Sequence, residues 1–153
     1  MSLLRPGDPA PNFRLSSPGG HKVALSDFVG RQPLVLYFYP KDDTPGCTRE
    51  ACAFRDAYAQ FVAAGAAVVG VSGDGGVSHA QFAARHRLPF PLLTDEDGAA
   101  RRAFGVPKTL GLLEGRVTFV IDKAGVIRHV FSSQIQPKRH VAEALRVLKV
   151  LAK

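Results

Sequence analysis

The segment 34–61 most constrains how this chain can fold, because an apolar run passes through a short polar connector into a helical pattern. Residues 34–39 (LVLYFY) are six apolar or aromatic residues in a row, which predicts a strand buried on both faces of a sheet. Pro40 ends this run. Beyond Cys47, apolar residues recur at helical spacing, so the first cysteine is expected where a buried strand leads into a helix.

The start of the predicted helix has chemical consequences for Cys47. Thr44 is a favoured N-cap residue and Pro45 a favoured first helical residue, which places Cys47 in the first turn. Unpaired backbone N–H groups and the positive end of the helix dipole favour a thiolate there. Asp42 and Asp43 act against a thiolate, so a lysine or arginine has to outweigh them.

The second cysteine, Cys52, follows Cys47 by five positions. In an ideal helix the two Cα atoms would lie about 8.6 Å apart, which is beyond the roughly 7 Å that a disulfide can bridge. The two cysteines can therefore form a disulfide only if the first turns of the helix unwind. Two alternatives stay open from the residues alone: an inert cysteine at a helix start for Cys47, and a small buried hydrophobe for Cys52.

The motifs around the cysteines are similar to those of a known family. Pro40, Thr44 and Cys47 fit the pattern PxxxTxxC, and GCTREACAFRD contains a C-x4-C pair. In these features the chain resembles the peroxiredoxins, and within them the bacterioferritin comigratory protein / peroxiredoxin Q subfamily. The likeness continues in VVGVSGD, SHAQFAARHRLPFPLLTD, FGV and GRVTFVID, so it covers most of the chain. Phe104 is a mild departure, because tyrosine is expected more often there.

The order of the predicted elements is typical of an α/β protein, in which strands alternate with helices and a hairpin and a helix close the chain. Strands are predicted at residues 13–15, 23–25, 34–39, 66–71, 92–93, 117–121 and 126–131. Helices are predicted at 26–30, from 44 to about 65, from 78 to about 88, at 98–104 and at 141–151. The resemblance implies a thioredoxin-like fold, with a central mixed β-sheet flanked by helices and an N-terminal β-hairpin extension.

For the cysteines, the resemblance implies a thiol-dependent peroxidase of the atypical 2-Cys type. Cys47 would be the peroxidatic cysteine, which reduces hydrogen peroxide or an organic hydroperoxide and becomes a sulfenic acid. Cys52 would resolve it as an intramolecular disulfide, and thioredoxin or a similar dithiol reductant would restore both thiols. The alternatives are a thiol–disulfide exchange protein, which usually carries C-x-x-C, and a basic interaction module or redox sensor.

The resemblance gives roles to four further residues. Arg116 would stabilise the Cys47 thiolate and polarise the peroxide, and Glu50 would orient Arg116. The Thr44 hydroxyl would contact the peroxide and the thiolate, and the Pro40 ring would shield the thiolate from water. The residue types alone indicate less: a solvent-exposed charge before a strand, a surface carboxylate, a helix cap and a strand terminator.

The formal charge of +7 and the pI of about 9.9 are compatible with an acidic partner such as nucleic acid. Lysine and arginine are dispersed, however, and no aromatic interleaving or nucleic-acid motif accompanies them, so we expect no nucleic-acid partner. The five histidines show no metal-ligand spacing, and the glycine-rich SGDGG lacks the lysine of a P-loop. We therefore expect no metal and no other cofactor.

The chain of 153 residues, 46% of them hydrophobic, is large enough for one core, so we expect a single domain over residues 1–153. It has neither an apolar run of about 18 residues nor a basic region followed by an apolar stretch at its start. This predicts no membrane partner and a cytoplasmic location, where cysteines are more often reactive than structural. The resemblance implies a monomer, because the cysteine that it makes the resolving one is in the same chain.

Overall fold

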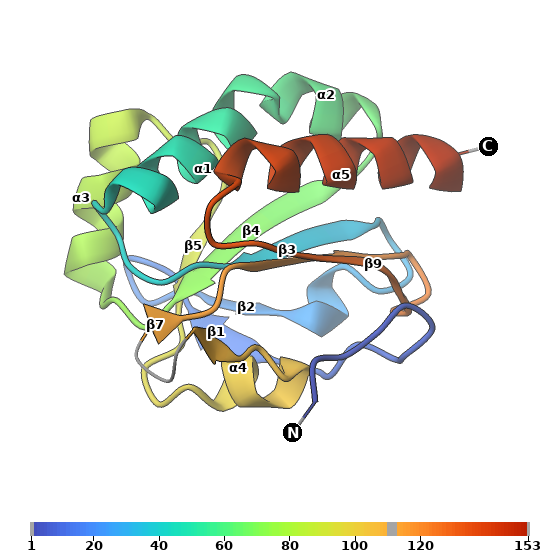
Figure 1. The fold of residues 1–153 in the computed structure, drawn as a ribbon, viewed down its shortest axis with the longest axis horizontal. Helices are drawn as coiled ribbons and strands as arrows, with labels where there is room; N and C mark the ends of the chain where they lie inside the picture. The colour runs from blue at the N-terminus through green and yellow to red at the C-terminus, as the bar shows by residue number, and fades with distance from the viewer. Residues whose placement is uncertain (1, 110–112, 153) are drawn as a thin grey trace.

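The computed structural model describes residues 2–109 and 113–152 and is built around a seven-stranded mixed sheet (Figure 1). The strand order is β2-β1-β5-β4-β3-β8-β9. The strands of this sheet are β1 (Arg14–Ser16), β2 (Lys22–Ala24), β3 (Leu34–Phe38), β4 (Ala67–Ser72), β5 (Leu92–Thr94), β8 (Val117–Ile121) and β9 (Ile127–Ser132). Two short strands, β6 (Lys108–Thr109) and β7 (Leu113–Glu114), pair in a separate sheet.

The helices lie on both faces of the sheet, as Figure 1 shows. They are α1 (Pro45–Asp56), α2 (Tyr58–Ala63), α3 (Gly76–His86), α4 (Ala99–Phe104) and α5 (Pro137–Leu151), with a 3-10 turn, η1, at Leu25–Asp27. One core lies between the sheet and the helices α1, α2, α3 and α5. A second core lies on the opposite face, under α4 and the N-terminal residues. The predicted α/β architecture, with a mixed sheet flanked by helices, is confirmed.

The central strand β3 explains why both cores meet at the sheet. All five of its residues are buried, as the apolar run predicts. Its alternate residues point to opposite faces, so Val35 and Tyr37 join one core, and Leu36 and Phe38 join the other. It pairs in parallel with β4 and antiparallel with β8.

The predicted N-terminal hairpin is confirmed, with its strands shifted by one residue. β1 and β2 pair antiparallel in the register Leu15↔Val23, and Ser16↔Thr94 joins the hairpin to β5 at the edge of the sheet. The predicted hairpin near the C-terminus is also confirmed, as β8 and β9. Among the residues that the structure describes, none of the helices has the length and apolar character needed to cross a membrane.

The long helix predicted to end near Gly65 is instead two helices. The chain leaves the helical conformation at Ala57, with φ −93° and ψ 2°, and α2 begins at the next residue. Phe54 before the break and Phe61 after it are both fully buried, and their ring centroids lie 5.7 Å apart. Neither a proline nor a glycine marks the break, so the local sequence carries no signal for it.

The fold places a site at the carboxyl ends of the parallel strands. β3 continues through residues 39–44 into the start of α1, and the neighbouring β4 leads into the loop before α3. In open α/β sheets, loops at this edge form the usual binding and catalytic sites. Cys47 therefore lies at the edge where such a site is expected.

Candidate active site

The start of α1 follows the prediction, except for the Thr44 side chain. Thr44 is the N-cap residue, with φ −89° and ψ 152°, and Pro45 opens the helix, which places Cys47 in its first turn. The Thr44 carbonyl oxygen accepts a hydrogen bond from the Thr48 N–H at 2.8 Å. The Thr44 hydroxyl donates to the Lys41 carbonyl at 2.9 Å and does not cap the helix.

Cys47 lies between an apolar core and a guanidinium group. Its exposed fraction is 1%, and it belongs to the core that includes Tyr37 and Phe54. On the other side is Arg116: a Cβ atom built on Gly46 would lie 2.8 Å from Nη2 of Arg116. Burial lowers the pKa of Arg116, but the neighbouring Glu50 carboxyl and Cys47 sulfur outweigh burial and raise it above its ordinary value. The Cys47 sulfur is therefore buried and lies close to a positive charge.

Arg116 and Glu50 form a buried pair at the floor of the site. Nη1 of Arg116 donates to Oε1 of Glu50 at 2.8 Å, and Nε donates to the Gln134 carbonyl at 3.3 Å. Glu50 is one helical turn beyond Cys47, and Arg116 immediately precedes β8. Their residue types alone indicated solvent-exposed charges, and this is wrong for both. Burial raises the pKa of Glu50 to about 8, although the Arg116 charge acts in the opposite direction.

His140, at the start of α5, contacts the far side of Glu50. Its Nδ1 lies 3.4 Å from Oε2 of Glu50 and 2.8 Å from the Thr118 hydroxyl. Its Nε2 lies 2.8 Å from the Ser133 carbonyl, so Nε2 carries the hydrogen and Nδ1 accepts one from Thr118. Burial lowers the pKa of His140 to about 4, which keeps the ring neutral. Sequence reasoning did not find this residue, since a single histidine near a helix start carries no signal.

The two carboxylates expected to oppose a thiolate are each paired with a basic residue of α3. Asp42 is buried, and its Oδ2 lies 2.7 Å from Nδ1 of His79. Tyr39 donates to Oδ1 of Asp42 at 2.6 Å. Burial raises the pKa of Asp42, but hydrogen bonds, above all those with His79 and Tyr39, outweigh burial and hold it below its usual range. Asp43 forms an ion pair with Arg85.

Asp42 also fastens the connector before α1 to the loop that follows β4. Its backbone N–H donates to Oδ2 of Asp74 at 2.8 Å, and the Ser72 hydroxyl donates to the same oxygen at 2.6 Å. Ligand atoms of Asp42, Asp74 and His79 lie within 4.8 Å of one another, a grouping that the spacing of these residues did not indicate. These atoms hydrogen-bond to protein groups, so together they form a hydrogen-bonded network.

Cys52 lies in the same continuous helix as Cys47, and both are free thiols. The separation of about 8.6 Å that helix geometry gives for their Cα atoms therefore applies, and the helix has to unwind before a disulfide can form. Cys52 is half-buried and lines a groove of about 530 Å³ between α1 and α5. Cys52 is therefore more accessible than Cys47.

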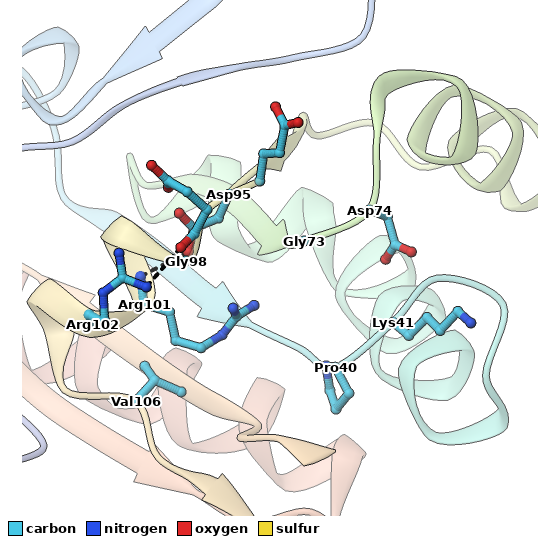
Figure 2. Close-up of a pocket in the computed structure, with 11 residues that line it drawn as sticks. Pro40, Lys41, Gly73, Asp74, Asp95, Gly98, Arg101, Arg102 and Val106 are labelled. Atoms are coloured by element: carbon cyan, nitrogen blue, oxygen red, sulfur yellow. Dashed lines mark hydrogen bonds between the residues drawn. The ribbon is translucent and has the colours of Figure 1, made fainter. Parts of the chain in front are cut away.

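Pro40 is half-buried and lines a cavity of about 610 Å³ (Figure 2). Figure 2 shows Pro40 and Lys41 on one side of this cavity, with Arg101 and Arg102 across from them. Nη1 of Arg102 donates to the Asp97 carbonyl at 2.7 Å. Cys47 is not part of the cavity wall, so this hollow adjoins the cysteine site without containing the sulfur.

Comparisons with known proteins agree with this geometry. Residues 6–130 match the AhpC/TSA family. Chloroplastic peroxiredoxin Q of Oryza sativa subsp. japonica is 51% identical over 146 residues, which are 95% of this chain and 67% of that protein. Chloroplastic peroxiredoxin Q of Arabidopsis thaliana is 49% identical over 150 residues, or 97% of this chain and 69% of that protein.

Solved structures show the same fold. Peroxidoxin BcpB from Mycobacterium tuberculosis superposes with a TM-score of 0.90 at 38% identity, covering 97% of this chain and 98% of that one. The bacterioferritin comigratory protein of Xanthomonas campestris superposes with a TM-score of 0.85 at 35% identity, covering 99% and 98% of the two chains. The predicted thioredoxin-like fold of the peroxiredoxins is confirmed.

The comparisons contradict the predicted cytoplasmic location. The peroxiredoxin Q relatives at about 50% identity are described as chloroplastic. The prediction depended on the lack of a membrane span and of a secretory signal, and neither feature separates the cytoplasm from a plastid.

The cysteine motif, the buried Cys47 beside Arg116 and the matching folds agree on one chemistry. The protein is a thiol-dependent peroxidase, an enzyme whose substrate is a hydroperoxide and whose reductant is of the thioredoxin type. The chain belongs to the AhpC/TSA family, as a peroxiredoxin of the Q type.

Proposed function

We propose that Cys47 is the peroxidatic cysteine of this peroxidase and that Cys52 resolves it. The observation that supports this most is the place of Cys47, buried in the first turn of α1 beside the Arg116 guanidinium. Free N–H groups at a helix start and a neighbouring cation both favour the thiolate, which is the nucleophilic form of cysteine. Cys52 lies beyond the first turn and is half-buried, which suits a later step.

In the first step the Cys47 thiolate attacks one oxygen of the hydroperoxide. An S–O bond forms as the O–O bond breaks, and the departing oxygen takes a proton and leaves as water or an alcohol. Cys47 is then a sulfenic acid. Arg116 and the Cys47 backbone N–H are the donors assigned to the charge that develops on the departing oxygen. The Thr44 hydroxyl can join them only after it turns away from the Lys41 carbonyl, to which it donates in this structure. The alkyl peroxide reduction activity described for the Xanthomonas campestris relative supports organic hydroperoxides as substrates.

Glu50 and Pro40 act on this step indirectly. Glu50 holds Nη1 of Arg116, which fixes the direction in which the rest of the guanidinium points. Pro40 belongs to the connector that leads to α1 and lines the cavity of Figure 2, and we assign its ring the role of limiting the access of water to Cys47. Neither Glu50 nor Pro40 is assigned a bond to the peroxide.

In the second step the first turns of α1 unwind and the Cys52 thiol attacks the Cys47 sulfenic acid. A disulfide forms and water leaves. A dithiol protein of the thioredoxin type then reduces the disulfide and becomes a disulfide itself. We also assign this cycle to a single domain and a monomer, because both cysteines are on one helix, and we assign no nucleic acid to it, because the basic residues are dispersed.

Stopped-flow measurement of peroxide loss tests the assignment of Cys47. The reduced wild-type protein should consume hydrogen peroxide rapidly, and Cys47→Ser should consume none above the uncatalysed rate. Cys52→Ser is the matched control, since it removes the other thiol from the same helix and should keep the first oxidation. Equal rates for Cys47→Ser and the wild type would show that the nucleophile is another group.

A further inference from the structure

The groove between α1 and α5 is a surface that the peroxidase step does not use. The two helices contact each other and lie side by side above the sheet (Figure 1). Cys52 and Ala53 line the α1 side of the groove, and Val141 and Leu145 line the α5 side. We call this hollow the Cys52 groove. It places an apolar surface directly beside the more accessible of the two thiols.

Two cations, Arg49 and Lys138, line the Cys52 groove, and both are exposed. The acidic residue of the lining, Asp56, is paired with Arg55 at 3.1 Å. Arg49 and Lys138 also line a neighbouring hollow, together with Ile135 and Arg139. Ile135 is 88% exposed, so a large apolar side chain lies in solvent next to three cations, Arg49, Lys138 and Arg139. This combination fits a protein that presents apolar contacts and acidic groups.

We propose that the dithiol protein that recycles the enzyme docks on the Cys52 groove and attacks the Cys52 sulfur of the Cys47–Cys52 disulfide. This rests on the proposed function, because it requires that disulfide. A protein reductant has to bring its own sulfur within bonding distance, so it must cover the surface around the sulfur that it attacks. In the folded helix the groove is that surface for Cys52, and its α5 side, with Lys138, Val141 and Leu145, remains when the first turns of α1 unwind.

The site of Cys47 makes it the better leaving group. A disulfide exchange is faster when the departing sulfur is stabilised as a thiolate. On leaving, Cys47 can return to the helix start beside Arg116, where a thiolate is favoured. This directs the attack to Cys52.

Unwinding of α1 gives the reductant a way to distinguish the oxidised enzyme. Val141 of α5 is buried in the core that contains residues of α1. When the first turns of α1 unwind, apolar surface of α5 loses part of its cover, while Lys138 stays in place on α5. A partner that contacts both therefore binds the oxidised enzyme more tightly than the reduced one.

The reduction proceeds in two exchanges. A thiolate of the reductant forms a bond with the Cys52 sulfur, the Cys52–Cys47 bond breaks, and its electron pair leaves with Cys47 as a thiolate. The second thiol of the reductant loses its proton and attacks the reductant sulfur in this mixed disulfide. The reductant leaves as a disulfide, and Cys52 leaves as a thiolate and takes up a proton.

The attacked sulfur can be identified by trapping. Oxidised enzyme is mixed with a thioredoxin whose second redox cysteine is replaced by serine, quenched in acid and digested with trypsin without reduction. Cleavage after Arg49 separates a peptide with Cys47, residues 42–49, from one with Cys52, residues 50–55. We expect the thioredoxin peptide on residues 50–55 in at least tenfold excess. A linkage mainly to residues 42–49 would overturn the proposal.

The docking surface is tested by charge reversal on α5. For each variant the measurement is the ratio of thioredoxin-driven to dithiothreitol-driven peroxide reduction, which cancels any change in the peroxide step. Lys138→Glu should lower this ratio about fivefold or more. Lys149→Glu is the matched control, because it makes the same charge change on an exposed residue of the same helix, away from the groove. Equal ratios for the two variants would overturn the docking surface.

A substitution that changes no charge tests whether the reductant or a hydroperoxide substrate occupies the Cys52 groove. Ala142→Trp fills the Cys52 groove, and Val150→Trp adds the same side chain at an exposed position outside it. We expect only Ala142→Trp to lower the thioredoxin-to-dithiothreitol ratio. A raised KM for a long-chain hydroperoxide with an unchanged ratio would assign the groove to substrate and overturn the proposal. A wild-type enzyme that reduced no peroxide with either thioredoxin or dithiothreitol would instead contradict the proposed peroxidase cycle itself.

Discussion

Glu50 and Arg116 are paired at 2.8 Å across 66 positions of the chain, and both are buried, with exposed fractions of 0% and 5%. Burial raises the pKa of Glu50 to about 8 although the Arg116 charge acts in the opposite direction, so Glu50 takes up a proton far more readily than an exposed carboxylate. The Glu50–Arg116 pair lies next to the Cys47 sulfur, and the charge of Arg116 acts on both the Glu50 carboxyl and this sulfur.

The first prediction concerns the pH dependence of stability. The pKa of Glu50 is raised from an ordinary 4.5 to about 8, so the folded state keeps a proton that the unfolded state loses. The stabilising contribution of Glu50 is therefore complete below about pH 4.5 and is lost as the pH rises through about 8. Relative to Glu50→Gln, which cannot ionise, the unfolding free energy of the wild type should fall by up to about 1.4 kcal/mol per pH unit.

Urea unfolding of the reduced proteins between about pH 5 and 9 measures this difference. Glu96→Gln, at an exposed position, is the matched control and should follow the wild type. A difference between the wild type and Glu50→Gln that stays constant over the whole range would contradict the raised pKa.

The second prediction concerns the close approach of Gly46 to Arg116. A Cβ atom at Gly46 would lie 2.8 Å from Nη2, so Gly46→Ala has to displace the guanidinium. Since small displacements of a positioned group can cost up to about a hundredfold in rate, we expect oxidation of Cys47 by peroxide to slow by about 10- to 100-fold. Stopped-flow kinetics measures the rate. In Gly76→Ala, the control at the start of α3, the added Cβ would meet nothing closer than 3.8 Å.

A Gly46→Ala variant oxidised as fast as the wild type would mean that the position of Arg116 does not control the reactivity of Cys47. A folded structure in the variant is expected, because alanine is a better helix former than glycine. Circular dichroism of both glycine variants checks this point.

The third prediction separates the two cysteines. Cys52→Ser should allow one oxidation of Cys47 and then stop, because the second thiol that forms the disulfide is missing. Mass spectrometry after one equivalent of peroxide should find a sulfenic acid on residues 42–49, trapped as a dimedone adduct, and no disulfide. Sustained turnover of Cys52→Ser with thioredoxin at the wild-type rate would show that Cys52 does not resolve the sulfenic acid.

The fourth prediction concerns local unfolding of α1. The distance between the cysteines in an intact helix requires that disulfide formation break backbone hydrogen bonds of the first turns, such as that from Thr48 to Thr44. Hydrogen exchange should therefore show at least tenfold lower protection for amides 48–52 in the oxidised protein than in the reduced one. Amides in the second half of α5 serve as an internal reference. Equal protection of residues 48–52 in both states would contradict the distance argument.

Local signals made the centre of the fold predictable. Six apolar residues at 34–39 identified β3, and the pair Thr44–Pro45 placed the start of α1, because both depend on residues adjacent in sequence. The end of α1 was not predictable in this way, since the break at Ala57 comes without a proline or glycine.

The surroundings of Cys47 were less predictable, because they come from distant parts of the chain. Residue type alone placed Arg116 and Glu50 in solvent, and only the resemblance to the peroxiredoxins indicated their pairing. The contact of Asp42 with His79, 37 positions away, had no signal in the sequence. A histidine and a carboxylate that are distant in sequence form such a contact only because the fold brings their two segments together.

The network around Asp42 has a consequence for repeated turnover. It ties the chain just before α1 to Tyr39, His79 and Asp74, so it anchors the upstream end of the segment that must open. A segment anchored next to its moving part has few conformations to search, and the entropy lost when it closes again is small. The enzyme can therefore unfold the start of α1 in each cycle and return the Cys47 sulfur to the same position.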